Sequence, residues 1–142
     1  DVSDLPKNAL VTRNLIEQWE RNHGPIQADD IVLFRFGWED LWAVRPSGQE
    51  FMRDWPGLGR EGSEYLVEKG VKAVGTDALA IDSYDSTDFS AHYTLLGNKI
   101  PIIENLCNLS SLPDFFLFFA FPLKIKDGSG SPVRAVAFVP QP

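Results

Sequence analysis

Apolar residues recur along the chain at two spacings, which predict helices alternating with strands. Residues 12–21 carry apolar side chains at helical spacing, and Gly24 followed by Pro25 ends that pattern. A similar helix is expected to begin near residue 59 and to end at Gly70. Residues 31–36 form a nearly continuous apolar run, which predicts a strand covered on both faces.

The middle of the chain continues this rhythm. Residues 71–77 are expected to form a strand, residues 91–96 a short helix, and residues 100–103 a further strand. Gly97, Asn98 and Lys99 form the turn between the last two. This order predicts the α/β (α+β) class with a mixed sheet.

The last part of the chain is rich in phenylalanine. The run from Phe115 to Phe121 lacks polar alternation and predicts a fully buried central strand, and residues 132–139 predict the last strand. No internal repeat and no boundary is visible, so we expect a single domain over residues 1–142.

A long connection between the first strand and the second helix carries large apolar rings. Loops of this length in compact domains are commonly lids or binding loops. The rings must pack on the domain, line a pocket or meet another subunit. They are Trp38, Trp42, Phe51 and Trp55.

Composition restricts the function classes. The chain of 142 residues has a net charge of −7 and no Lys/Arg-rich block, so neither nucleic acid nor a membrane is an expected partner. The single cysteine, Cys107, excludes an internal disulfide and a cysteine-rich zinc site. We expect a cytoplasmic protein. Because the chain begins with Asp1 rather than methionine, we also expect that its start has been lost.

Two side chains have the chemistry of metal ligands. His92 lies just inside the predicted short helix, and Glu104 ends the next strand, twelve residues later. A neutral imidazole and a carboxylate both bind borderline divalent cations. A structural hydrogen bond between the two is the alternative interpretation.

Other polar residues are interpreted structurally. His23 is expected to interact with the dipole at the C-terminus of the first helix. Asp82, Asp85 and Asp88 lack the spacing and the central glycine of a calcium loop, so residues 80–90 are expected to form a solvated loop.

Four segments together resemble the cyclase family of metal-dependent hydrolases, which includes bacterial kynurenine formamidase, isatin hydrolase and a trans-dienelactone hydrolase. The segments are DDIVLFRFGW, YLVEKGVKAVGTDALAID, AHYTLLGNKIPIIENLCNL and FPLKIKDGSGSPVRAVAFVP. The resemblance implies a swivelling β/β/α fold. It also implies a site for one or two metal ions, zinc or manganese, that activates water against an amide, a lactam or a lactone.

The resemblance also implies roles for individual residues. His92 and Glu104 match metal ligands of the formamidase branch, Trp38 lies at a position near the substrate, and Asp77 matches a structural or metal-supporting aspartate. Glu104 favours the formamidase or lactonase branch, whereas the first helix and the FVPQP tail are closer to isatin hydrolase.

The family's His-x-Gly-Thr-His-x-Asp motif does not occur in this sequence. We therefore expect the C-terminal portion of such a hydrolase, incomplete at its N-terminus, with weak or no metal binding by this chain alone. The alternative is an inactive homologue that acts by binding. Expected partners are a ring-bearing small molecule and either a second copy of the chain or the missing N-terminal segment.

Overall fold

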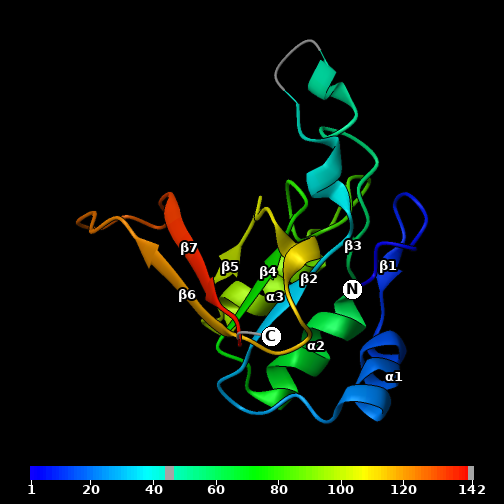
Figure 1. Cartoon of the computed structure of the whole chain (residues 1–142), viewed down its shortest axis with the longest axis vertical. Coiled ribbons are helices and arrows are strands. Elements are labelled where there is room, and N and C mark those ends of the chain that lie inside the picture. Colours follow the sequence, from blue (N-terminus) through cyan, green and yellow to red (C-terminus); the bar gives the residue numbers. More distant parts are fainter. Residues whose placement is uncertain (44–46, 141–142) are drawn as a thin grey trace. The chain divides into compact units, whose positions relative to one another are not determined.

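The computed structural model describes residues 1–43 and 47–140 of the chain. Contacts divide it into two compact units, Asp1–Ser110 and Ser111–Pro142. The first unit holds the helices and the parallel strands, and the second holds an antiparallel hairpin (Figure 1). The expectation of a single domain over residues 1–142 stays a prediction.

A three-stranded parallel sheet forms the centre of the first unit. Its strands are β2 (Ile31–Phe34), β4 (Ala73–Thr76) and β5 (Ile102–Ile103), and β4 lies between the other two. All four residues of β4 are buried, because this strand has a neighbour on each side. Each crossover between parallel strands contains a helix, α2 (Arg60–Lys69) after β2 and α3 (Ser90–Gly97) after β4. The alternation of strands and helices is the one that the sequence predicts, whereas the parallel pairing of these strands is seen only in the structure.

The first unit also contains a second, smaller sheet and a further helix. A two-stranded parallel sheet joins β1 (Leu10–Val11) to β3 (Gly57–Leu58), and α1 (Arg13–His23) lies between these strands in the sequence. The predicted ends of both long helices are confirmed. Gly24 has a φ of 101° after α1, and Gly70 has a φ of 72° after α2, a left-handed conformation that favours glycine.

The described residues of the connection, 38–43 and 47–57, project beyond the end of β2 (Figure 1). They contain two 3₁₀ turns, η1 (Trp38–Leu41) and η2 (Ser47–Gln49), and a third, η3 (Leu109–Ser111), follows later in the chain. Trp38, Phe51 and Trp55 are buried, which confirms simple packing for three of the four rings. Trp42 remains exposed.

The core of the first unit joins the helices to the sheet. Leu66 of α2, Leu95 of α3 and Val74 of β4 are completely buried and belong to one apolar cluster. Ile81 in the connection after β4 is also completely buried in this cluster. Burial of such side chains contributes about 2 kcal/mol each. The core therefore fixes the backbone of residues near 81 as firmly as it fixes the helices.

The second unit is a hairpin of β6 (Leu117–Pro122) and β7 (Val133–Phe138), with Leu117 opposite Phe138. The prediction of a fully buried central strand over residues 115–121 is wrong. Phe115 is 61 % exposed, Leu117 60 % and Phe121 58 %. The phenylalanine-rich strand has one pairing partner among the described residues, so it is a hairpin strand with an exposed face.

The α/β class is confirmed, with parallel and antiparallel strands in separate sheets over the described residues. Across residues 1–43 and 47–140, the structure contains no helix of the length and apolar character that a membrane crossing needs.

Gly57 in β3 provides a test of this packing. A Cβ atom at this position would lie 2.0 Å from the backbone nitrogen of Ser83 and 2.4 Å from the carbonyl carbon of Asp82. We expect Gly57→Ala to lower the free energy of unfolding by about 3 kcal/mol, because backbone atoms cannot move aside cheaply. Urea denaturation measures this loss.

Gly97 at the end of α3 is the matched control, because a Cβ there would meet nothing within 4 Å. Gly97→Ala is expected to leave stability unchanged or slightly raised. Equal effects of the two substitutions would contradict the close approach of β3 to residues 82–83.

Candidate functional site

His92 and Glu104 meet at the carboxyl ends of two neighbouring strands. Glu104 directly follows β5, and His92 is the third residue of α3, the helix that leads from β4 into β5. His92 Nε2 lies 3.3 Å from Glu104 Oε1. In parallel sheets the carboxyl ends of the strands are the usual place for ligand-binding groups. The topology therefore brings together the two residues that the sequence predicts as metal ligands.

Asp82 holds the other side of the imidazole ring. Its Oδ2 atom lies 2.5 Å from His92 Nδ1, and the Asp82 side chain is only 3 % exposed. The same carboxylate accepts the backbone N–H groups of Ala91 at 2.8 Å and of His92 at 3.2 Å. Phe89 occupies the N-cap position of α3 and makes no side-chain cap hydrogen bond. Asp82 therefore supplies the acceptor that the helix N-terminus requires.

The backbone next to Asp82 orients the glutamate. The Ile81 N–H donates a hydrogen bond to Glu104 Oε1 at 2.9 Å, and the Trp55 indole N–H donates to the Asp82 carbonyl at 2.8 Å. Since Ile81 is completely buried, this backbone has little freedom to move. Residues 81–82 thus position both His92 and Glu104.

The two carboxylates of the site, Asp82 and Glu104, change the protonation of His92. The hydrogen bond to Asp82, followed by that to Glu104, raises the pKa of His92 from 6.5 to about 9. Partial burial acts in the opposite direction but does not outweigh these two interactions. Without a metal ion, the site therefore favours an imidazolium bound by two carboxylates.

His92 and Glu104 have the chemistry of ligands for a divalent cation, but two ligands are too few to form a complete site. An imidazole nitrogen whose other ring nitrogen is held by a carboxylate is the usual form of a metal-binding histidine. A catalytic zinc site, however, normally has three protein ligands. Over residues 1–43 and 47–140, no group of three or more His, Cys, Asp or Glu side chains is placed to hold a metal ion. His92 and Glu104 are thus two potential ligands of an incomplete set.

The structure places Asp77 away from solvent, directly after β4. Its carboxylate accepts the backbone N–H of Phe36 at 2.7 Å and that of Glu39 at 3.2 Å, and the residue is completely buried. Burial raises the pKa of the Asp77 carboxyl, although these N–H groups act against the rise. Asp77 therefore ties the end of β4 to the start of the 38–57 connection, and its role beside a metal stays a prediction.

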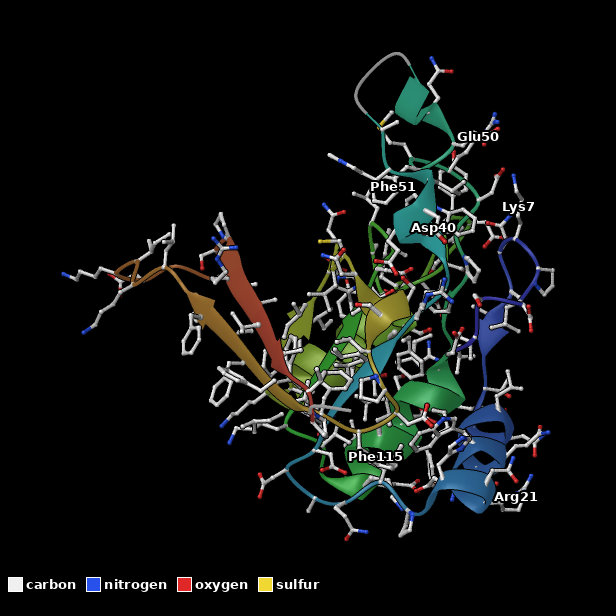
Figure 2. The ribbon with its side chains drawn as sticks, viewed as in Figure 1. Lys7, Arg21, Asp40, Glu50, Phe51 and Phe115 are labelled. Carbon is white, nitrogen blue, oxygen red and sulfur yellow. The ribbon has the colours of Figure 1, made fainter. Side chains whose placement is uncertain are left out.

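Trp38 is buried, and its indole N–H donates to the carbonyl of Phe51 at 3.1 Å. Its contact with substrate stays a prediction. The exposed Trp42 and the buried Phe51 form an aromatic pair, in an edge-to-face contact with centroids 5.2 Å apart. Figure 2 shows Phe51 and Asp40 on this projecting part of the chain.

An open pocket of about 340 Å³ lies beside this aromatic pair. Asn105, which follows Glu104, contributes to its wall. The other lining residues are Glu39, Asp40, Trp42, Phe51, Leu106, Cys107, Asn108 and Ser110. His92 and Glu104 do not line the pocket, so it borders the candidate site without containing it.

Sequence reasoning missed Asp82. Residues 80–90 were expected to form a solvated loop, which is wrong for Asp82 at 2 % exposure and for the buried Ser83. No sequence signal pointed to Asp82, because Ser90 precedes the predicted helix and is itself a common N-cap residue. The structure instead places Phe89 at the N-cap, and Asp82 accepts the first N–H groups.

Comparisons with known proteins identify the family. The model of the Cyclase family matches residues 1–83. The chain belongs to the cyclase family. It is 35 % identical to isatin hydrolase of Roseibium aggregatum over 141 residues, which cover 93 % of this chain and 53 % of that protein. It is 37 % identical to kynurenine formamidase of Erythrobacter litoralis over 112 residues, which cover 78 % of the chain and 49 % of the relative.

Solved structures show the same fold. A crystal structure of an isatin hydrolase bound to the product analogue thioisatinate superposes with a TM-score of 0.89 at 31 % identity. The match covers 98 % of this chain and 56 % of that one. A structure described as a "Potential Metal-Dependent Hydrolase With Cyclase Activity" matches all of this chain and 69 % of its own, with a TM-score of 0.73 and 25 % identity. The chain spans about half the length of the curated relatives it matches.

The pKa of His92 predicts a pH dependence of stability in the absence of metal. A folded-state pKa of about 9, above the unfolded value of 6.5, means that the folded state binds the proton more tightly. The stabilisation is complete below about pH 6.5 and is lost as the pH rises toward 9. With a chelator present, the free energy of unfolding should fall across this range, as measured by urea denaturation at each pH.

His92→Gln should remove most of this fall, whereas His23→Gln should preserve it. His23 lies at the end of α1, where its ring stacks on Trp19. A fall that persists in His92→Gln would contradict the assignment.

Asp82→Asn tests the positioning of the imidazole. The substitution removes the charge that pairs with His92 and puts a donor where the structure needs acceptors. The free energy of unfolding should fall by about 2 kcal/mol. Asp85→Asn is the control, since Asp85 is exposed in the same loop, and it should change stability by less than about 0.5 kcal/mol.

Proposed function

We propose that this chain supplies two ligands, His92 and Glu104, to the divalent-metal site of a hydrolase of the cyclase family. The observation that carries the proposal is the 3.3 Å separation of His92 Nε2 and Glu104 Oε1 at the carboxyl ends of the parallel strands. The substrate would be an amide, a lactam or a lactone. The names of the relatives, isatin hydrolase and kynurenine formamidase, support this class of hydrolysis.

The residues of the chain would have distinct roles. His92 would bind through Nε2, while Asp82 keeps its Nδ1 occupied and its ring oriented. Glu104 would bind through a carboxylate oxygen, with the Ile81 N–H fixing its side chain. Zinc or manganese, when bound, would lower the pKa of water and polarise the scissile carbonyl. The matching structure described as metal-dependent supports a divalent cation and does not distinguish between these two metals.

A ring-bearing substrate suits the surroundings of the site. The pocket beside Asn105 is lined by Trp42 and Phe51, and the exposed Trp42 presents apolar ring surface there. N-Formylkynurenine is the first substrate to test, because it combines an aromatic ring with a formamide. Isatin, a lactam fused to an aromatic ring, is the second. We expect the reaction to take place in the cytoplasm.

The remaining ligands would come from outside the described residues. The chain spans about half of its relatives, so a further segment of polypeptide or another chain would complete the site. A second candidate function follows from the same observation. With two donors in place of three, the chain would act without catalysis, as a binding or oligomerisation module.

Activity is tested on the complete product of the gene that encodes this sequence. With Mn²⁺ or Zn²⁺ it should hydrolyse N-formylkynurenine or isatin, and Glu104→Gln should reduce kcat/KM by at least about 100-fold, because a ligand is lost. Glu64→Gln on the exposed side of α2 is the matched control and should retain activity. No hydrolysis above a metal-free control with amide, lactam and lactone substrates would defeat the enzymatic proposal.

Metal titration by calorimetry on the 142-residue chain separates the two candidate functions. One-to-one binding of Zn²⁺ or Mn²⁺ that disappears in His92→Ala would support a metal site and argue against an inactive module. Heat that is unchanged in His92→Ala would assign the binding to other carboxylates.

A further inference from the structure

Trp55 lies near the end of the 38–57 connection and contacts the loop that follows β4. Its indole N–H donates a hydrogen bond to the Asp82 carbonyl at 2.8 Å, and its own carbonyl accepts the backbone N–H of Tyr84 at 3.1 Å. The rings of Trp55 and Tyr84 meet edge to face, with centroids 5.1 Å apart. Trp55 therefore holds this loop on both sides of residue 83.

The pairing continues into β3. The Leu58 N–H donates to the Ile81 carbonyl at 2.8 Å, so residues 55–58 lie beside residues 81–84. Trp55 is 9 % exposed and Asp82 2 %, so water has little access to the bond between them. A buried carbonyl that loses its donor costs free energy, and hydrogen bonds weaken steeply when they bend. The indole N–H therefore fixes the direction of the Asp82 carbonyl.

The residue that Trp55 fixes is the one that holds the imidazole. The carbonyl and the side chain of Asp82 are joined through the same Cα atom, so a rotation of this backbone also moves the carboxylate. That carboxylate accepts the His92 Nδ1–H and the Ala91 N–H. Apolar packing by itself would be served almost as well by phenylalanine, which has no ring donor. The distinguishing property of Trp55 is thus its N–H group.

We propose that Trp55 is a positioning residue of the candidate site: its indole N–H fixes Asp82, and Asp82 aims His92 Nε2 toward Glu104. Trp55 acts through Asp82 and supplies no ligand of its own. The orientation of His92 follows from contacts within this chain. Its consequence for catalysis rests on the proposed function, and the two are tested separately.

Nuclear magnetic resonance of the 142-residue chain, with a chelator present, tests the positioning without metal or substrate. The His92 Nδ1–H proton is identified by its absence in His92→Gln and should resonate far downfield, because a carboxylate accepts it. Trp55→Phe keeps an aromatic ring and the backbone bond to Tyr84 but removes the donor. Exchange of the Nδ1–H proton with water should become at least about 5-fold faster, the factor expected for one net hydrogen bond.

Trp38→Phe is the matched control. Trp38 is also buried, and its indole N–H donates to a backbone carbonyl, that of Phe51, at 3.1 Å. The substitution therefore removes a hydrogen bond of the same kind in another part of the connection, and exchange of the His92 proton should stay unchanged. We expect similar losses of stability for the two variants in urea denaturation, so that the difference in exchange reports the positioning.

Exchange that is unchanged in Trp55→Phe would overturn the inference, as would equal acceleration in Trp55→Phe and Trp38→Phe. A wild-type chain without a downfield Nδ1–H proton would also overturn it, because the hydrogen bond between Asp82 and His92 would then be absent.

The catalytic consequence is measured on the complete product of the gene with Mn²⁺. Trp55→Phe should lower kcat about 10-fold and leave KM unchanged, because a ligand is displaced while the substrate pocket is kept. An unchanged kcat would overturn a role for this positioning in catalysis. A wild-type gene product without hydrolytic activity would defeat the proposed function alone, since the exchange measurement does not depend on it.

Discussion

The carboxylate of Asp82 is the interaction on which the candidate site depends. It accepts the His92 side chain and two backbone N–H groups at the start of α3, so one buried charge fixes both the helix and the imidazole. A buried carboxylate is stable only when its oxygens are satisfied in this way. The direction in which His92 Nε2 faces Glu104 follows from that requirement.

Close packing behind Asp82 makes this arrangement rigid. Gly57 of β3 approaches the backbone of residues 82–83 so closely that no side chain fits, and the Trp55 indole N–H binds the Asp82 carbonyl. Ile81 contributes its side chain to the core and its N–H to Glu104. Ile81 and Asp82 therefore belong to both the apolar core and the polar site, so a shift of the core backbone also moves the groups that hold His92 and Glu104.

The two units differ in how far they bury their apolar side chains. The first unit covers its central strand β4 with neighbouring strands and helices, and its acidic side chains other than Asp77 and Asp82 are exposed or half-buried. The hairpin has few charges and a face of exposed rings. This contrast separates a unit that positions polar groups from a unit whose apolar side chains are largely exposed.

Local sequence determined the helices that end at Gly24 and Gly70, the alternation of strands and helices, and the residues with ligand chemistry, because these depend on periodicity, capping and residue type. Resemblance to a family supplied the pairing of His92 with Glu104, which spacing alone left open. Only the tertiary structure revealed Asp82 as the partner of His92, since its burial depends on the close approach of β3, which is distant in sequence. It alone also decided that β6 is an exposed hairpin strand, because the number of neighbours of a strand is a property of the whole sheet and is not encoded in the strand's own residues.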